Sequence, residues 1–134
     1  MGEVKRVLFV CTGNSARSQM AEGLLRALGA GRFEVFSAGT APKGLNPLAV
    51  QALAEIGLDL SGHTAKGLEP FLNQPFDYVI TVYDRANEAC PVFPGGRARR
   101  HWSFADPHDL ADFRRVRDEI AARLRAWLAE QTDE

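Results

Sequence analysis

The pattern of apolar and polar positions predicts strands and helices that alternate along the chain. Four consecutive apolar residues, 7–10, are typical of a strand that is buried on both faces, as in a parallel sheet. Apolar residues then recur at helical spacing over residues 18–28, and Gly29 is placed to end that helix. Residues 33–37 alternate like a second strand, and residues 77–82 form a third apolar run. The first half of the chain therefore indicates an α/β fold.

The remaining elements continue this alternation. Asn46 and Pro47 predict the start of a helix, with a cap and a first-turn proline, and its apolar face is expected to include Ile56. Residues 98–102 are expected to form a short fourth strand. The clearest helix spans residues 113–127, where one apolar stripe lies opposite arginines and acids. Strands separated by helices predict a parallel sheet with right-handed crossovers, which binds ligands at its carboxyl edge.

The loop after the first strand lies at that edge and has the composition of an anion-binding site. Gly13 and Asn14 tolerate the dihedral angles that turn successive N–H groups inward, and the following helix adds its positive end. Arg17 presents a planar fork that can bind two oxygens of a tetrahedral anion. The residues predicted to bind the oxyanion are Thr12, Gly13, Asn14, Ser15, Ala16, Arg17 and Ser18.

Cys11, which ends the first apolar run, is the predicted nucleophile. A cysteine in such a field is expected to be largely thiolate at neutral pH, and the Ser18 hydroxyl is placed to donate to its sulfur. The alternative is a buried structural cysteine followed by an ordinary turn. The strand before, the glycine inside and the helix after the loop favour the nucleophile.

The segment from Cys11 to Gly23 resembles the active-site loop of the low-molecular-weight protein tyrosine phosphatases and, more closely, of the arsenate reductases that share their fold. It reads CTGNSARSQMAEG, and its extension over residues 18–23 favours the arsenate reductase branch. The resemblance runs from the first strand to the last helix. It implies a single domain over residues 1–134, with a four-stranded parallel sheet in the order 2-1-3-4 and helices on both faces.

Asp106 lies in a segment that resembles the general-acid loop of this family. When a thiolate displaces an oxygen from a bound anion, the leaving oxygen must collect a proton. The neighbouring Trp102 and Phe104 are predicted to desolvate Asp106 and keep its proton available near neutrality. Asp109 is the competing acid, and an Asp-Pro turn or a helix cap is the alternative role for either carboxyl group.

Three further residues are placed around the loop by the pattern and the resemblance. Ser37 follows the second strand and is predicted to hold Asn14 in its strained conformation, with a simple turn as the alternative. Lys66 matches a position where some arsenate reductases carry an acid that helps bind potassium, and a lysine there argues against a metal. His63 is expected to be packed and hydrogen-bonded, because no second metal ligand follows at a suitable spacing.

The segment of residues 81–91 resembles the loop that carries two resolving thiols in three-cysteine arsenate reductases. Cys90 matches the last of these thiols, but Tyr83 stands where the middle one belongs. Two routes remain open: Cys90 attacks Cys11 directly, or an outside thiol does so, supplied by thioredoxin, glutaredoxin or a small thiol such as mycothiol. A small buried hydrophobic residue is the alternative role for Cys90.

Composition and charge exclude several other classes of protein. The chain has 134 residues, of which 46% are hydrophobic, so it suits one compact core. The net charge of −1 and the lack of a basic stripe argue against nucleic-acid binding. No apolar run approaches the roughly 20 residues that span a membrane, and the two cysteines make no disulfide framework. We expect a cytoplasmic monomer without a cofactor.

Three functions are compatible with these features. The first is reduction of arsenate to arsenite through a cysteine–arsenic adduct that a second thiol resolves. The second is hydrolysis of phosphotyrosine through a phosphocysteine, and the third is a non-catalytic oxyanion-binding or redox-sensing protein. Arsenate and phosphate have the same shape and charge, so the loop does not separate the first two. Cys90, and the absence of aromatic residues at Pro107 and His108, favour arsenate.

Overall fold

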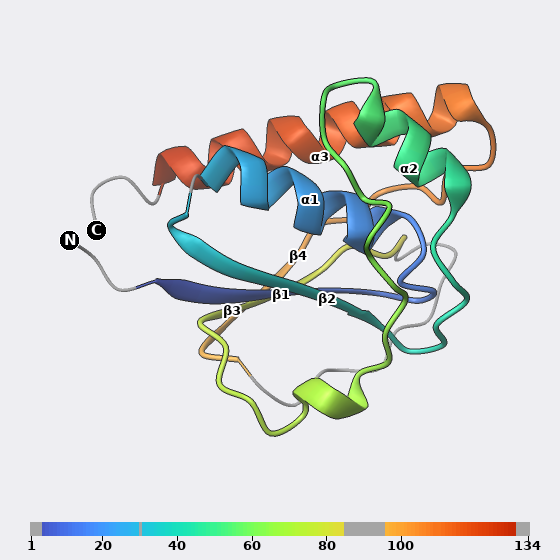
Figure 1. The fold of residues 1–134 in the computed structure, drawn as a ribbon. Coiled ribbons are helices and arrows are strands. Elements are labelled where there is room, and N and C mark those ends of the chain that lie inside the picture. The colour runs from blue at the N-terminus through green and yellow to red at the C-terminus, as the bar shows by residue number, and fades with distance from the viewer. Residues whose placement is uncertain (1–3, 30, 85–95, 131–134) are drawn as a thin grey trace.

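The computed structural model describes residues 4–29, 31–84 and 96–130, and its centre is one four-stranded parallel sheet. The strands lie in the order β2-β1-β3-β4, as expected (Figure 1). Their bounds are β1 Lys5–Cys11, β2 Phe33–Gly39, β3 Tyr78–Thr81 and β4 Ala98–His101. Each pair of neighbours is parallel, so the carboxyl ends of all four strands meet at one edge.

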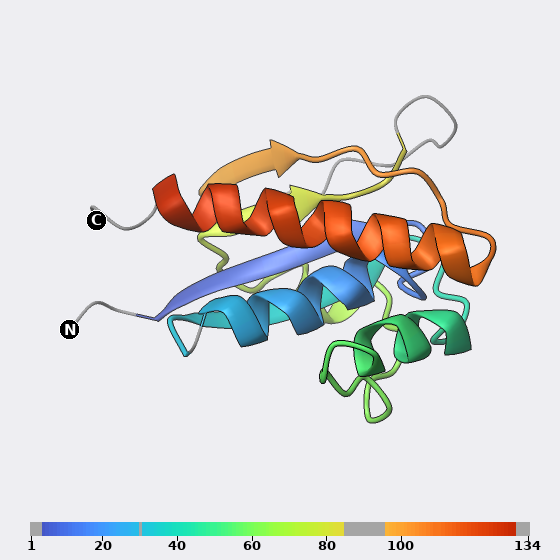
Figure 2. The same ribbon diagram turned by 90° about the horizontal axis from the view of Figure 1, so that it is seen from above.

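The helices divide unequally between the two faces of the sheet. The bounds are α1 Arg17–Gly29, α2 Pro47–Ala54, the 3-10 helix η1 Glu69–Phe71 and α3 Leu110–Glu130. The three α-helices cover one face, and η1 lies on the other (Figures 1 and 2). The expectation of helices on both faces therefore holds, with the second face covered by a single short turn and its flanking segments within the described residues. No helix in the described part of the chain is long and apolar enough to cross a bilayer.

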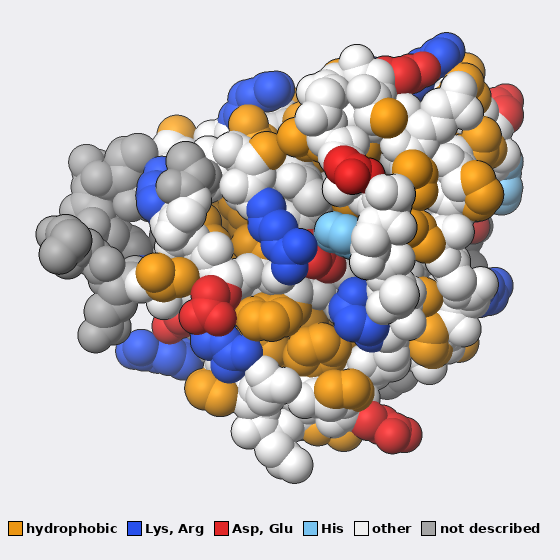
Figure 3. Space-filling view, viewed as in Figure 1, with side chains coloured by type: hydrophobic (Ala, Val, Ile, Leu, Met, Phe, Trp, Pro, Cys, Tyr) orange, Lys and Arg blue, Asp and Glu red, His pale blue; other side chains and the backbone are white. Residues whose placement is uncertain are grey.

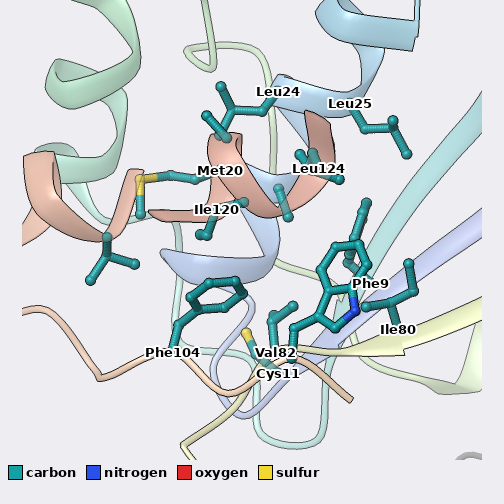
Figure 4. Packing of buried hydrophobic residues seen from close by; sticks show 14 of the residues in the cluster. Phe9, Cys11, Met20, Leu24, Leu25, Ile80, Val82, Phe104, Ile120 and Leu124 are labelled. Carbon is teal, nitrogen blue, oxygen red and sulfur yellow. The ribbon is translucent and has the colours of Figure 1, made fainter. Parts of the chain in front are cut away.

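The central strand β1 is buried on both sides, which explains its unbroken apolar run. Val7, Phe9 and Cys11 belong to the larger core cluster beneath the α-helices. Leu8 and Val10 belong to the smaller cluster on the η1 side. Side chains alternate along a strand, so this pattern places the Cys11 sulfur on the face covered by α1 and α3. In Figure 4 Cys11 lies at the edge of the cluster that includes Phe9 and Phe104.

The helix α2 begins as the sequence predicts and ends earlier. The Asn46 side chain caps it by accepting a hydrogen bond from the Leu48 amide at 2.8 Å, and Pro47 is its first residue. The expectation that Ile56 lies on the buried face was wrong, because the helix ends at Ala54 and the Ile56 side chain is 47% exposed. Gly57, with φ of 83°, turns the chain away directly afterwards.

Candidate active site

The loop between β1 and α1 is cradled by the segment that follows β2. The main-chain oxygens of Thr12, Gly13 and Ser15 accept hydrogen bonds from the amides of residues 41, 43 and 46, at 2.8, 3.0 and 2.9 Å. In a planar trans peptide the next N–H points opposite to the carbonyl group. The amides that follow these carbonyls therefore face away from the cradling segment, which is the arrangement that an anion nest requires.

Cys11 and Ser18 are in contact across this loop. The Cys11 Sγ and Ser18 Oγ atoms are 2.8 Å apart, and both residues are buried. The Ser18 oxygen also accepts a hydrogen bond from Asn14 Nδ2 at 2.8 Å. Because the amide occupies a lone pair of that oxygen, the hydroxyl proton is available for the sulfur. This geometry agrees with the predicted donation from Ser18 to Cys11.

Arg17 is the first residue of α1, and its guanidinium contacts the segment between β4 and α3. Its Nη1 donates to the Phe104 carbonyl at 3.1 Å. Its Nη2 lies 3.6 Å from the Asp106 carboxylate, although the Arg17 side chain is 5% exposed and that of Asp106 is 58% exposed. The structure thus brings Arg17 and Asp106 together, as the sequence analysis expected of a binding residue and an acid that act on one ligand.

The predicted desolvation of Asp106 by its aromatic neighbours was wrong. Trp102 and Phe104 are both buried in the core beneath α1 and α3. Their rings point away from solvent, with the Trp102 ring centroid 6.3 Å from that of Phe9. The alternation breaks after Phe104, where Ala105 and Asp106 are both exposed and Pro107 is buried, so the Asp106 carboxyl group meets water and Arg17 instead of aromatic rings.

Asp109, the competing acid, has a structural role. Its Oδ1 accepts a hydrogen bond from the Asp112 amide at 2.8 Å, at the start of α3. This is the helix-cap interaction that the sequence analysis gave as the alternative to catalysis. Asp106 therefore carries the carboxyl group of this segment that lies next to the oxyanion loop (residues 11–18).

Asn14 is held by partners other than the one expected. It is the non-glycine residue with positive φ, 47°, in the described part of the chain. Its Oδ1 accepts from the Lys66 amide at 2.7 Å and from Gln19 Nε2 at 3.1 Å. The prediction that Ser37 holds Asn14 was wrong, because the Ser37 hydroxyl donates to Glu22 Oε1 at 2.5 Å. Ser37 pairs in register with Phe9, two positions before the loop, which puts it within reach of α1 instead.

Gly39, the last residue of β2, lies directly against the loop. A Cβ atom at this position would stand 2.6 Å from the Thr12 carbonyl oxygen and 2.7 Å from the Asn14 amide nitrogen. These distances are far below van der Waals contact, and both atoms belong to the main chain. The sequence showed a glycine after the second strand, but only the three-dimensional packing shows why a side chain is excluded.

A charged cluster of Glu22, Arg26, His63 and Lys66 lies beside the loop. Figure 3 shows one face of the molecule, on which a histidine side chain lies among basic and acidic ones. Buried Glu22 pairs with Arg26 at 2.7 Å and lies 3.8 Å from His63 Nδ1. That nitrogen is 3.0 Å from Gln19 Oε1, so His63 is hydrogen-bonded and partly buried, which confirms the prediction. Burial lowers the pKa of His63, and the attraction of Glu22 opposes this effect.

The Lys66 side chain occupies the position at which a potassium site was considered. Its Nζ donates to the Thr64 carbonyl at 2.8 Å. Burial lowers the pKa of Lys66, while the charge of Glu22 raises it. An ammonium group already lies on this carbonyl oxygen, and Arg26 already neutralises Glu22, so the residues present do not fit a potassium site.

The structure describes Tyr83, which stands where a middle resolving thiol belongs, but not Cys90. Tyr83 follows β3 and packs on the His101 ring, with a centroid separation of 4.6 Å. His101 Nδ1 is in turn 2.6 Å from Thr81 Oγ1. Cys90 lies outside the described residues. Within those residues Cys11 is the free thiol.

Comparison with known proteins agrees with this geometry. Arsenate reductase 2 of Staphylococcus saprophyticus is 41% identical over 125 residues, which cover 92% of this chain and 95% of that protein. A solved arsenate reductase in the phosphate binding state has a TM-score of 0.83 at 35% identity, with 95% of this chain and 98% of that one covered. A thioredoxin-dependent arsenate reductase of Corynebacterium glutamicum has a TM-score of 0.78 at 31% identity, covering 99% of this chain and 65% of that one.

The family model extends over almost the same range. The model described as low molecular weight phosphotyrosine protein phosphatase matches residues 6–134, from β1 past the end of α3. The match includes Cys11, the loop of residues 12–18 and the segment that carries Asp106. The chain therefore belongs to the low molecular weight phosphotyrosine protein phosphatase family.

Proposed function

We propose that this protein reduces arsenate to arsenite, with Cys11 as the nucleophile. The observation that carries the proposal is the contact of a buried Cys11 sulfur with Ser18 at 2.8 Å, in a loop that Arg17 closes. The relatives support it, because a protein 41% identical is named an arsenate reductase and a solved arsenate reductase with a TM-score of 0.83 is in the phosphate binding state. The substrate is a tetrahedral oxyanion and the electrons come from thiols.

In the first step the Cys11 thiolate attacks arsenic. A sulfur–arsenic bond forms, one arsenic–oxygen bond breaks, and the leaving oxygen takes a proton from Asp106 and departs as water. Arg17 binds two of the remaining oxygens, and the loop amides bind the charge that develops on them. Arsenic remains in its pentavalent state in this adduct.

In the second step another thiolate attacks the Cys11 sulfur. A disulfide forms, the sulfur–arsenic bond breaks, and its electron pair stays on arsenic, which leaves as trivalent arsenite. Two thiols are oxidised while arsenic gains two electrons, so the step balances. Because Tyr83 stands where a middle cysteine belongs, the attacking thiol is either Cys90 or an outside thiol. The thioredoxin-dependent relative makes a thioredoxin-like protein one such donor.

Phosphotyrosine hydrolysis is the second candidate, since the family carries that name and the loop binds either anion. In that reaction Cys11 becomes a phosphocysteine, and Asp106 activates the water that cleaves it. Aromatic residues that would flank a phosphotyrosine ring are absent beside Asp106, where a buried Pro107 and an exposed His108 follow. This difference favours arsenate.

Parallel assays separate the two reactions. The protein is incubated with arsenate and, separately, with p-nitrophenyl phosphate, each with thioredoxin, glutaredoxin or small thiols. Arsenite release that depends on a thiol is the expected result, and the Cys11→Ser variant should be inactive with both substrates. Nitrophenol release without arsenite release would establish the phosphatase instead. Product release by Cys11→Ser would reject the assigned nucleophile.

The role of Cys90 is tested with the same assay. If Cys90 is the resolving thiol, Cys90→Ser stops thioredoxin-coupled turnover. The arsenic adduct then stays on Cys11, where mass spectrometry detects it. Unchanged turnover with outside thiols would assign Cys90 a structural role and the second step to the outside reductant.

A further inference from the structure

The left-handed backbone of Asn14 is the strained point of the oxyanion loop. Its φ of 47° is disfavoured for a residue with a Cβ atom, and the other positive values in the described chain belong to glycines. A left-handed residue within a turn is how successive amides come to point at one anion. Whatever holds Asn14 therefore influences how well the loop binds an oxyanion.

Gln19, on the first turn of α1, lies within hydrogen-bond distance of Asn14 at two atoms. Its side chain is fully buried. The Nε2 atom lies 3.1 Å from the Asn14 main-chain oxygen, 3.1 Å from Asn14 Oδ1 and 2.9 Å from the Thr64 carbonyl. A fully buried amide is unusual for glutamine, and all of these contacts are with one loop and the segment packed on it.

The orientation of the Gln19 amide is determined by its neighbours. Three oxygens surround Nε2, so this atom must be the nitrogen. The opposite atom, Oε1, is 3.0 Å from His63 Nδ1, which then carries the proton and donates. Burial lowers the pKa of His63, so the neutral ring with its proton on Nδ1 is the form that supports Gln19 at neutral pH.

The contact with the Asn14 main chain distinguishes Gln19 from the other partners. Ser18 and the Lys66 amide bond only to the Asn14 side chain. Gln19 also binds the main-chain oxygen, whose position follows the backbone dihedral angles directly. Through Thr64 it ties the loop to the 64–66 segment, whose Lys66 carbonyl accepts from the Gly39 amide at 2.8 Å.

We propose that Gln19 is a positioning residue that raises the affinity of the loop for oxyanions by holding Asn14 in its left-handed conformation. Its hydrogen-bond partners are Asn14, Thr64 and His63, and it acts on the oxyanion site through Asn14. The proposal rests on the oxyanion site, and it holds for arsenate and for phosphate alike. It therefore does not depend on which reaction follows binding.

The test uses inorganic phosphate as the probe. Phosphate shields Cys11 from iodoacetamide, and peptide mass spectrometry follows Cys11 separately from Cys90. Gln19→Met keeps the length of the side chain but removes the amide, and the phosphate dissociation constant is expected to rise roughly tenfold. Gln19→Glu keeps the shape and loses the donor, so it should change affinity in the same direction if Gln19→Met does not fold.

A matched control separates positioning from general destabilisation. Arg117, on α3, is also buried and donates to the Ala52 carbonyl at 2.8 Å and to Glu55 at 3.1 Å, remote from the loop. Arg117→Met is expected to lower the unfolding midpoint and leave the phosphate dissociation constant within about twofold. If it weakens phosphate binding as much as Gln19→Met does, the effect of Gln19 is merely structural and the proposal fails.

The decisive measurement is a double-mutant cycle with Asn14→Gly. Glycine adopts a positive φ without the Cβ penalty, so the loop no longer needs the same support. In that background the effect of Gln19→Met should shrink to about twofold. An equal effect in both backgrounds, or no effect in the wild-type background, would overturn the proposal. If phosphate does not protect wild-type Cys11 at all, the oxyanion site itself is rejected, and the proposed function with it.

Discussion

The oxyanion loop, residues 11–18, and the segment of residues 102–109 meet at the Arg17 guanidinium but are held in different ways. The loop is fixed by main-chain hydrogen bonds on one side and by Ser18, Gln19 and the Lys66 amide on the other. The other segment is anchored through buried Trp102 and Phe104, while its Asp106 carboxyl group stays 58% exposed. The molecule thus combines a loop held by hydrogen bonds on two sides with a carboxyl group that meets solvent.

This difference has a physical reason. Binding a tetrahedral anion requires amides that already point at one position, so reorganisation on binding must be small. A general acid must exchange its proton with solvent in every turnover, which an exposed carboxyl group does readily. The first prediction is therefore that the loop determines affinity while Asp106 determines the rate of the chemical step.

Asp106→Asn should produce the largest separation of these two quantities. We expect kcat to fall roughly a hundredfold or more, because the leaving oxygen loses its proton donor. The phosphate dissociation constant should stay within a few-fold, since the loop is untouched and the charge next to Arg17 is removed. Steady-state kinetics and phosphate protection of Cys11 measure the two effects. A comparable loss in both would mean that Asp106 organises the loop.

Arg17→Lys should instead weaken binding and chemistry together. Lysine cannot bind two oxygens with a planar fork, and it also loses the contact with the Phe104 carbonyl that Arg17 makes at 3.1 Å. We expect kcat/KM to fall roughly a hundredfold. Phosphate protection of Cys11 should weaken in parallel. A near-normal rate would argue against bidentate binding by Arg17.

His63 should have the smallest effect, and it appears as a dependence of stability on pH. Burial lowers the pKa of His63 below its ordinary value of 6.5. The charges of Arg26 and Lys66 lower it further, and those of Glu22 and Asp59 oppose this. The unfolded chain then binds the proton more readily, so stability is unaffected above pH 6.5 and declines as the pH falls below it. Thermal melts at pH 7.5 and pH 5.5 should differ less for His63→Gln than for the wild type. An equal pH dependence in both proteins would show that His63 does not cause it.

The strands and the main helices were predictable because local patterns encode them. An unbroken apolar run identifies β1, and Asn46 with Pro47 identifies the start of α2. The strand order 2-1-3-4 was predicted from the family resemblance rather than from periodicity. The loop residues were predicted to bind an oxyanion because a glycine, an asparagine and an arginine between strand and helix have few other uses.

Apart from the early end of α2, the errors concern where a side chain points and which partner it reaches. Ser37 binds Glu22 instead of Asn14, and the rings beside Asp106 point into the core. Gln19 was missed as a supporting residue because its partners include Thr64, 45 positions away. A sequence pattern gives the face on which a side chain lies, but the partner it reaches depends on how elements pack.

The bare end of β2 has a consequence for how this catalyst can be altered. Because Gly39 has no side chain, the main chain at Thr12 and Asn14 packs directly on the main chain of β2. The position of the loop is therefore set by contact between two stretches of main chain. Substitution of exposed side chains around the loop would leave this main-chain contact intact. A single added methyl group at position 39 would force the loop to move, although that position is not among the residues predicted to bind the oxyanion.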